Sequence, residues 1–293
     1  MINRVFSILG AQWLIHQDTA ISHLPVLISL MKGQDLNFTT TENEKPYVLA
    51  FAGPSENISL VGRWDLRDSN IPENSVAIIQ IGGLICSWDS ISVIEQLRSI
   101  KDNDLINSVV IVINSPGGMV APLDLLSNSI KSLGKPSIVM ITGMCASGAM
   151  WVASAADYRI ATSRIDVIGS IGTKTSIQDN SAMLEKEGIK ITDIYATLST
   201  RKDEESRSLM EKKDTAPMVA FLDFINDHFH QTIRENLNIS AESEVFTGAA
   251  FFAEKAQQLG LINEINTMDY ALQKAYSLGL KHKIINQSKS LNF

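Results

Sequence analysis

The sequence predicts an α/β fold built around a mostly parallel sheet. Two observations carry this prediction: buried-type apolar runs alternate with segments of helical spacing, and a turn rich in glycine or polar residues follows each run. The clearest unit joins the runs "SVAIIQIGGLI" (75–85) and "SVVIVIN" (108–114) through the helical spacing of "SISVIEQLRSI" (90–100). Such a βαβ unit implies parallel strands with a right-handed crossover.

The same alternation extends along the rest of the chain. Further strands are expected over 47–51, 137–142, 158–161, 167–172, 190–196 and 261–265. Further helices are expected after Ser147, from Met268, and over 121–133, 179–187, 249–260 and 204–236, the last with a break near Pro217. We expect an N-terminal helical extension and connector over 1–70, a catalytic domain over 71–265, and a C-terminal helix and tail over 266–293.

Composition excludes several classes of function. The 293 residues are 45% hydrophobic and 19% charged, which is typical of a globular chain. The net charge of −7 argues against a nucleic-acid-binding face. Polar residues interrupt the apolar stretch between Val5 and Leu30, so we expect a peripheral helix there and no membrane span. Cys86 and Cys145 form no CxxC pair, so we expect no disulfide framework, no metal site, no cofactor and a reducing compartment.

Two turns at strand ends are the candidate site, because sites in open α/β sheets gather at the carboxyl ends of strands. The first is "NSPGG" (114–118), whose paired glycines let a backbone N–H approach a ligand closely. The second is "GMCASG" (143–148), which places Ser147 where a strand becomes a helix. An attacking Ser147 hydroxyl would leave its oxyanion near the Gly148 N–H at the start of that helix.

Spacing alone leaves the role of Ser147 open. A serine before a helix is most often an N-cap, which contributes about 1 kcal/mol, and paired glycines are most often only a turn. A nucleophilic serine also needs a group that takes its proton. The choice between cap and nucleophile therefore depends on the base.

Histidine is the usual base, and no histidine falls between residues 24 and 227. His228 and His230 lie on a helical stretch with several phenylalanines and fit partly exposed helix positions. The alternative is a neutral lysine, whose pKa has to fall from about 10.4 to roughly 7–8 through burial or a cationic neighbour. The lysines that follow Ser147 in this region are Lys174, Lys186, Lys190 and Lys202.

Six ordered motifs make the sequence resemble a known family. They are "INSPGG", "GMCASGAMWVASAADYRIAT", "IGSIGTKTSI", "LEKEGIKITDIYA", "RKD" and "FTGAAFFAEKAQQLGLINEI", spread over about residues 75–265. In this order they are similar to the signal peptide peptidase A proteases, the serine–lysine relatives of the Clp protease. That resemblance implies a crotonase/ClpP-like fold of ββα-type repeats.

The resemblance also implies roles for individual residues. Ser147 would be the nucleophile, Lys202 the general base and Ser170 the hydroxyl that orients the lysine, with Lys174 as the fallback base. Backbone amides of Gly117, Gly118 and Gly148 would form the oxyanion hole. Two positions depart from the family pattern: Ala149 replaces a second glycine after the serine, and "LSTRKD" replaces an "SGxxKD"-like segment before the lysine.

The family implies a serine endopeptidase that cleaves unfolded or signal-peptide-like polypeptide segments as a homo-oligomeric ring, with 204–236 and the N-terminal segment as interfaces. Cellular signal peptide peptidases carry a membrane anchor, which we do not expect in this sequence. Compact forms without the anchor resemble phage head-maturation proteases, which implies a cytoplasmic protein or one inside a phage prohead. Two alternatives stay open. One is a crotonase-type acyl-CoA hydratase or isomerase, and the other is a non-catalytic capsid assembly protein in which Ser147 is only a cap.

Overall fold

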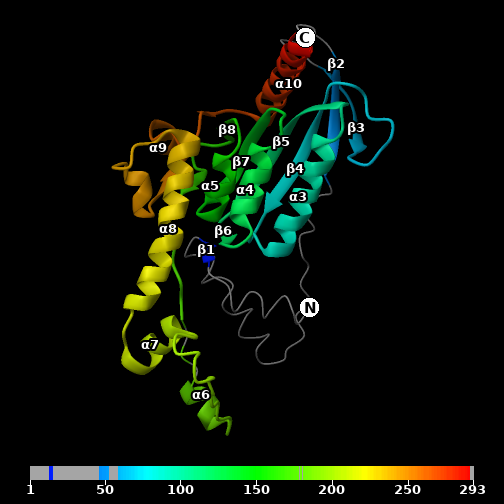
Figure 1. The fold of residues 1–293 in the computed structure, drawn as a ribbon. Coiled ribbons are helices and arrows are strands. Elements are labelled where there is room, and N and C mark those ends of the chain that lie inside the picture. Colours follow the sequence, from blue (N-terminus) through cyan, green and yellow to red (C-terminus); the bar gives the residue numbers. More distant parts are fainter. Residues whose placement is uncertain (1–12, 16–45, 53–58, 178, 180, 291–293) are drawn as a thin grey trace.

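A twisted sheet runs through the centre of the computed structural model, which describes residues 13–15, 46–52, 59–177, 179 and 181–290 (Figure 1). Its strands lie in the order β10-β9-β7-β5-β4-β2-β3, and β8 lies between β7 and β11. The strands are β2 (Tyr47–Ala52), β3 (Ser59–Asp65), β4 (Ser75–Gly82), β5 (Ile106–Ser115), β7 (Ser137–Ala146), β8 (Tyr158–Ala161), β9 (Val167–Gly169), β10 (Ala250–Phe252) and β11 (Glu264–Ile265). All pairs among β4, β5, β7, β8, β9 and β11 are parallel, whereas β2, β3 and β10 pair antiparallel.

Helices cover both faces of the sheet because its central strands are apolar on both sides. Alternate residues such as Ile79 and Ile111 pack under α3 (Ser87–Lys101), α4 (Leu123–Lys131) and α5 (Gly148–Ser154). Their neighbours, such as Ile78 and Val110, pack against α10 (Met268–Ser290) on the other face. Successive residues of each strand therefore point alternately into the two cores, one on each face of the sheet.

An arm of helices projects from one end of the sheet (Figure 1). It comprises α6 (Ser181–Lys186), α7 (Glu204–Lys212) and α8 (Ala216–Leu237). The C-terminal part of α8 is anchored, because Phe229 and Ile233 are fully buried and the Phe229 ring stacks on Trp151 of α5 at 4.8 Å. The N-terminal part of α8 carries α7 away from the sheet.

Short elements complete the two ends of the molecule. The 3-10 helix η1 (Glu244–Thr247) and α9 (Ala253–Gln258) flank β10 beside β9. β6 (Gly117–Met119) follows β5 directly and pairs with β1 (Trp13–Ile15) in a small separate sheet. Among the described helices, none is both long enough and apolar enough to cross a membrane.

The predicted α/β class with a mostly parallel sheet is confirmed, as is the first βαβ unit, which is β4-α3-β5. The break in 204–236 is also confirmed, although the chain turns at Lys213, which adopts a left-handed conformation. Pro217 lies in the first turn of α8, where proline is tolerated. The division into segments at residues 70 and 265 stays a prediction.

Three expectations were wrong in detail. Residues 190–196 form no strand, because they lie on the arm with Ile194 90% exposed and have no sheet edge to pair with. The helix expected over 5–30 is a strand at Trp13–Ile15, and the rest of that stretch lies outside the described residues. The helix expected over 249–260 begins only after β10, whose three residues pair with β9.

Candidate active site

Ser147 occupies a sharp turn between β7 and α5. Its backbone dihedrals are φ 54° and ψ −121°, a conformation that L-residues rarely adopt and that costs about 1–3 kcal/mol. Hydrogen bonds hold it there: its N–H donates to the Gly169 carbonyl at 2.7 Å, and its carbonyl accepts from the Met150 N–H at 2.8 Å. The side chain makes no capping hydrogen bond to α5, so the structure contradicts the reading of Ser147 as a simple helix cap.

A bulge in β7 sets up this turn. Ile113 of β5 pairs with Ile141, but Ser115 pairs with Cys145, so β7 carries two extra residues around Gly143. Gly143 has φ 108°, which favours glycine, and its N–H donates to the buried carboxylate of Asp166 at 3.0 Å. The same carboxylate accepts hydrogen bonds from the backbone N–H groups of Thr162 and Ser163. Asp166 therefore ties the bulge before Ser147 to the loop that follows β8.

The glycine turn after β5 lies beside the segment that leads into Ser147, as the Ser115–Cys145 pairing requires. The Gly117 N–H donates to Ser115 Oγ at 3.1 Å, so this amide is already used within the turn. The Gly117 carbonyl accepts from the Ile85 N–H, and the Met119 N–H donates to the Ile85 carbonyl. Gly118, between them, therefore directs its own N–H to the opposite edge of β6. The amides that this geometry leaves for a reacting oxyanion are those of Gly118 and Gly148.

Replacement of Gly118 by alanine is expected to disrupt this turn. A Cβ at position 118 would lie 2.0 Å from the Ile85 carbonyl oxygen, a backbone atom that cannot move aside without breaking the β6 contacts. We expect Gly118→Ala to reduce hydrolysis of an unfolded protein by about 100-fold or more, because the amide would be displaced from the oxyanion position. The matched control is Gly134→Ala, before the other end of β7, where a Cβ meets nothing within 4 Å. Its φ of 73° costs alanine only about 1–2 kcal/mol, so this variant should stay folded and active. Activity of Gly118→Ala close to that of Gly134→Ala would contradict this prediction.

Ser170 lies one residue beyond β9, next to the turn that holds Ser147. Ala146 pairs with Gly169, so the residues that follow them, Ser147 and Ser170, leave neighbouring strand ends. Ser170 also has a positive φ, 52°, and its N–H donates to the Ala249 carbonyl at 2.7 Å. The sheet thus brings together Ser147, Ser170 and the glycine turn.

Lys202, the base implied by the sequence motifs, lies apart from Ser147 and the glycine turn. Lys202 lies exposed in the turn before α7, where its N–H donates to the Ser199 carbonyl. α7 packs against α8 and lies well away from α5 (Figure 1). The start of α8 is about 20 Å from Phe229, given 1.5 Å of rise per residue over 13 residues. Within one chain the structure therefore does not bring Lys202 to Ser147.

The other candidate lysines divide into two groups. Lys174 is half-buried on the segment that leaves Ser170, where the neighbouring Thr173 N–H donates to Asn226 Oδ1 of α8 at 3.1 Å. Lys186 and Lys190 are exposed on the arm, as the sequence predicts. Lys174 is therefore the candidate lysine on the segment nearest in sequence to Ser170.

Comparison with known proteins identifies the family. The model of Peptidase family S49 matches residues 129–280, which include Ser147, Ser170, Lys174 and Lys202. The chain belongs to peptidase family S49. The family expected from the sequence motifs is thereby confirmed.

The S49 chain resembles proteins named as proteases in three kinds of organism. A candidate protease of Methanocaldococcus jannaschii is 30% identical over 196 residues, which cover 63% of this chain and 60% of the relative. A chloroplastic serine protease SPPA of Arabidopsis thaliana is 27% identical, with 72% and 33% covered. Capsid assembly protease C of Escherichia phage lambda is 25% identical, with 67% and 48% covered. The matched part thus spans less than two thirds of each of these relatives.

Among solved structures, the S49 chain is similar to a ClpP1 variant from Listeria monocytogenes. The TM-score is 0.42 and the sequence identity 18%, over 66% of this chain and 92% of the other.

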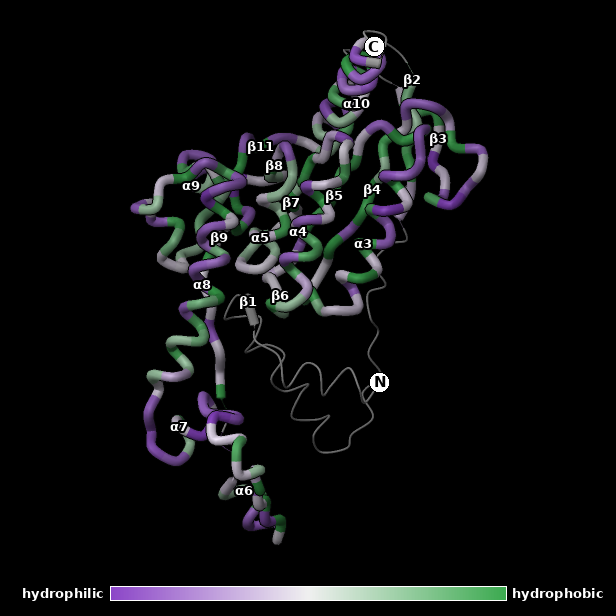
Figure 2. The backbone as a smooth tube through the Cα atoms, in the orientation of Figure 1, coloured by the Kyte–Doolittle hydropathy of each residue, from purple (hydrophilic) through white to green (hydrophobic). Residues whose placement is uncertain are grey.

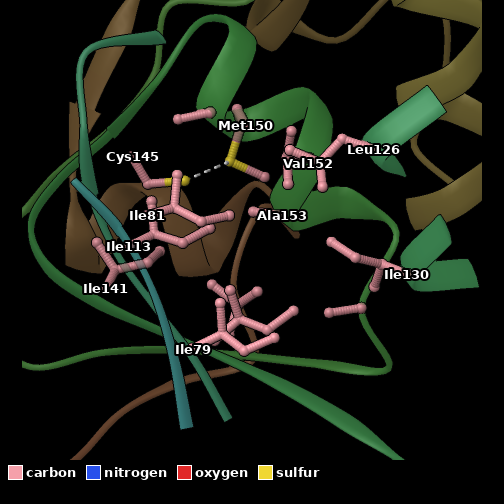
Figure 3. Packing of buried hydrophobic residues seen from close by; sticks show 14 of the residues in the cluster. Ile79, Ile81, Ile113, Leu126, Ile130, Ile141, Cys145, Met150, Val152 and Ala153 are labelled. Atoms are coloured by element: carbon pink, nitrogen blue, oxygen red, sulfur yellow. Dashed lines mark hydrogen bonds between the residues drawn. The ribbon is translucent and has the colours of Figure 1, made fainter. Parts of the chain in front are cut away.

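Cys145 lies two residues before Ser147 in the S49 chain and provides no competing nucleophile. It is fully buried, its Sγ lies 4.0 Å from Met150 Sδ, and burial raises the pKa of its thiol (Figure 3). The thiol therefore stays protonated, and a protonated thiol is a poor nucleophile. No disulfide joins it to Cys86.

His228, for which the sequence predicts a partly exposed helix position, contacts α5 in the S49 chain. α8 brings the His228 ring to 5.3 Å from the Trp151 ring, one helical turn after Ser147, and His228 Nε2 lies 3.4 Å from Asp124 Oδ1. His230 faces the other way, toward Phe246, and burial lowers its pKa against an opposing hydrogen bond to the Ile171 backbone. The contact between His228 and Trp151 depends on the tertiary packing of α8 on α5, so no local sequence signal pointed to it.

Proposed function

We propose that this chain is a serine endopeptidase that cleaves extended, unfolded polypeptide segments with a Ser–Lys dyad. The observation that carries the proposal is the backbone of Ser147, strained and without a capping bond, beside the glycine turn. Strained strand-to-helix turns are a recurring way to expose a nucleophilic serine, and backbone strain tends to persist where function uses it.

The proposed reaction has two halves, acylation of Ser147 and hydrolysis of the acyl-enzyme. Ser147 Oγ attacks the scissile carbonyl carbon while neutral Lys202 Nζ takes the hydroxyl proton. The carbonyl π electrons move to oxygen, which accepts hydrogen bonds from the N–H groups of Gly118 and Gly148. Collapse of this intermediate breaks the C–N bond, and the leaving amine takes the proton from the lysine. Water then hydrolyses the acyl ester by the same proton path and restores Ser147.

We propose that a second copy of the chain supplies Lys202. The lysine lies on the projecting arm apart from Ser147 of its own chain, and burial against a neighbouring copy is one way in which a lysine loses its charge. The arm carries apolar residues among its polar ones, as α6 and the start of α8 show in Figure 2. Its exposed hydrophobic residues include Met183, Ile191, Ile194, Leu198, Val219 and Phe224. Apolar area of this kind marks an interaction surface, which supports a homo-oligomer, such as a ring, as the working form.

Ser170 would orient the lysine in this arrangement, because it leaves the strand end beside Ser147. The lambda phage relative is named as a capsid assembly protease, which supports capsid or scaffold proteins as the substrates. Such a role would place the protein in a bacterial host cytoplasm or inside a prohead.

Covalent labelling by a fluorophosphonate tests which lysine is the base. We expect intact-mass spectrometry to show one adduct on the unchanged chain at high protein concentration. Lys202→Ala should slow labelling by about 100-fold or more, because the hydroxyl would lose its base. Lys174→Ala and His228→Asn should label at nearly the unchanged rate. Slow labelling of Lys174→Ala with normal labelling of Lys202→Ala would move the role of base to Lys174.

A second candidate function is a non-catalytic assembly protein. The separation of α7 from α5 within one chain favours this candidate. A protein that kept the fold but lost its activity would also hold Lys202 apart from Ser147. Failure of Ser147 to label at any protein concentration would support this candidate. The acyl-CoA hydratase alternative has no observation in its favour in the described site.

A further inference from the structure

Strand β1 lies on the glycine turn of the candidate site. Its three residues pair antiparallel with β6, with Trp13 opposite Met119, Leu14 opposite Gly118 and Ile15 opposite Gly117. β1 comes from the N-terminal part of the chain, about a hundred residues before β6 in sequence, so this is a long-range contact (Figure 1).

The edge of β6 that β1 lines is the edge that faces a reacting carbonyl. The other edge is occupied by Ile85, which exchanges hydrogen bonds with Gly117 and Met119. N–H groups of successive strand residues alternate in direction, so the Gly118 N–H points to the β1 side. Leu14, directly opposite Gly118, therefore places its backbone where the carbonyl of a bound peptide has to lie.

A peptide substrate needs the same edge. Extended peptides bind by adding a strand to an unpaired sheet edge, where main-chain hydrogen bonds provide affinity. For the scissile carbonyl to reach both Gly118 and Ser147, the peptide has to run along β6. β1 and a substrate therefore exclude one another.

We propose that the segment carrying Trp13–Ile15 is an intramolecular blocking strand, which fills the peptide position and holds the protease inactive until it leaves β6. This inference rests on the proposed function of the site. An intramolecular strand competes at an effective concentration on the order of 1 mM, so even a weak three-residue pairing excludes a dilute substrate. Its shortness also makes the block reversible, since a strand pair of this size is marginal by itself.

The variant Leu14→Pro tests the block in the full chain. Proline has no N–H and is poorly accommodated in a paired strand, so it should release β1 from β6. We expect Ser147 of Leu14→Pro to react with the fluorophosphonate about tenfold faster or more. The labelling rate is proportional to the fraction of molecules in which β1 has left β6, and the proposal requires that fraction to be below about a tenth in the unchanged chain. Urea unfolding should keep its midpoint, because the pairing involves only a small separate sheet.

A synthetic peptide of residues 10–18 completes the test. Added to Leu14→Pro, it should slow labelling and raise the KM for an unfolded protein substrate without lowering kcat, as competition requires. The matched control is the same peptide with proline at the position of Leu14, which should have no effect.

The outcomes separate this inference from the proposed function. Equal labelling rates in the unchanged chain and Leu14→Pro would overturn the blocking strand while leaving the nucleophile intact. Cleavage of the chain within 13–15 by its own Ser147 would also overturn it, because β1 would then be a substrate. No labelling of either chain, at any protein concentration, would overturn the proposed function itself.

Discussion

Ser147→Ala is expected to reduce hydrolysis of an unfolded protein by about 10⁴-fold or more, because the hydroxyl that would form the acyl-enzyme is removed. The fold should be unaffected. The Ser147 side chain makes no capping hydrogen bond to α5, and alanine in the same backbone conformation carries the same strain. The free energy of unfolding should therefore change by less than about 1 kcal/mol.

The measurement is the initial rate of cleavage at matched enzyme concentration, with urea unfolding of each variant. Ser99→Ala is the matched control, since Ser99 is exposed on α3 and its hydroxyl donates to the Glu95 carbonyl of its own helix. It should cleave at the unchanged rate. If Ser147→Ala retained the rate of Ser99→Ala, Ser147 would not be the nucleophile.

Two inactive variants are expected to restore one another when mixed. Ser147→Ala lacks the nucleophile and Lys202→Ala lacks the base, but a site formed between copies can take Ser147 from one and Lys202 from the other. With random exchange of subunits, about a quarter of the sites would hold both groups. The mixture should therefore recover about a quarter of the unchanged activity after dilution, exchange and reconcentration.

Complementation distinguishes a shared site from one completed within a chain. A mixture that stays inactive, after exchange has been verified by mass, would show that Lys202 acts on Ser147 of its own chain or not at all. The control mixture combines Ser147→Ala with Lys186→Ala, because Lys186 is an exposed lysine on the same arm. It measures the activity that remains after mixing and subunit exchange. It should reach about half of the unchanged rate, because only one of the two chains lacks a group of the site.

The parallel core could be predicted from sequence because its signals are local. The apolar runs of β4, β5 and β7 and the helical spacing of α3 each define their element without reference to the rest of the chain. Ser147 could be singled out in the same way, since a serine among small residues at the end of an apolar run marks a strand-to-helix turn. Ordered motifs then indicated the family.

Other features depend on tertiary structure and had no local signal. The run 190–196 alternates like a strand, but an alternating run becomes a strand only when it finds an edge to pair with. The proximity of Ser170 to Ser147 depends on the pairing of Ala146 with Gly169. The position of Lys202 depends on how the arm packs, which neighbouring residues in the sequence do not determine. The three residues of β1 are too few for a periodic pattern.

The bulge in β7 has a consequence for how this protein can change over evolutionary time. Before the bulge, β7 pairs with β8, and after it with β9, so the two halves of one strand have different neighbours in the sheet. A sequence change that shifts β9 moves Ser170 relative to Ser147 but leaves the pairing of Ile138–Ile141 untouched. The geometry of the proposed nucleophile can therefore diverge between relatives while the buried sheet that stabilises the fold stays the same.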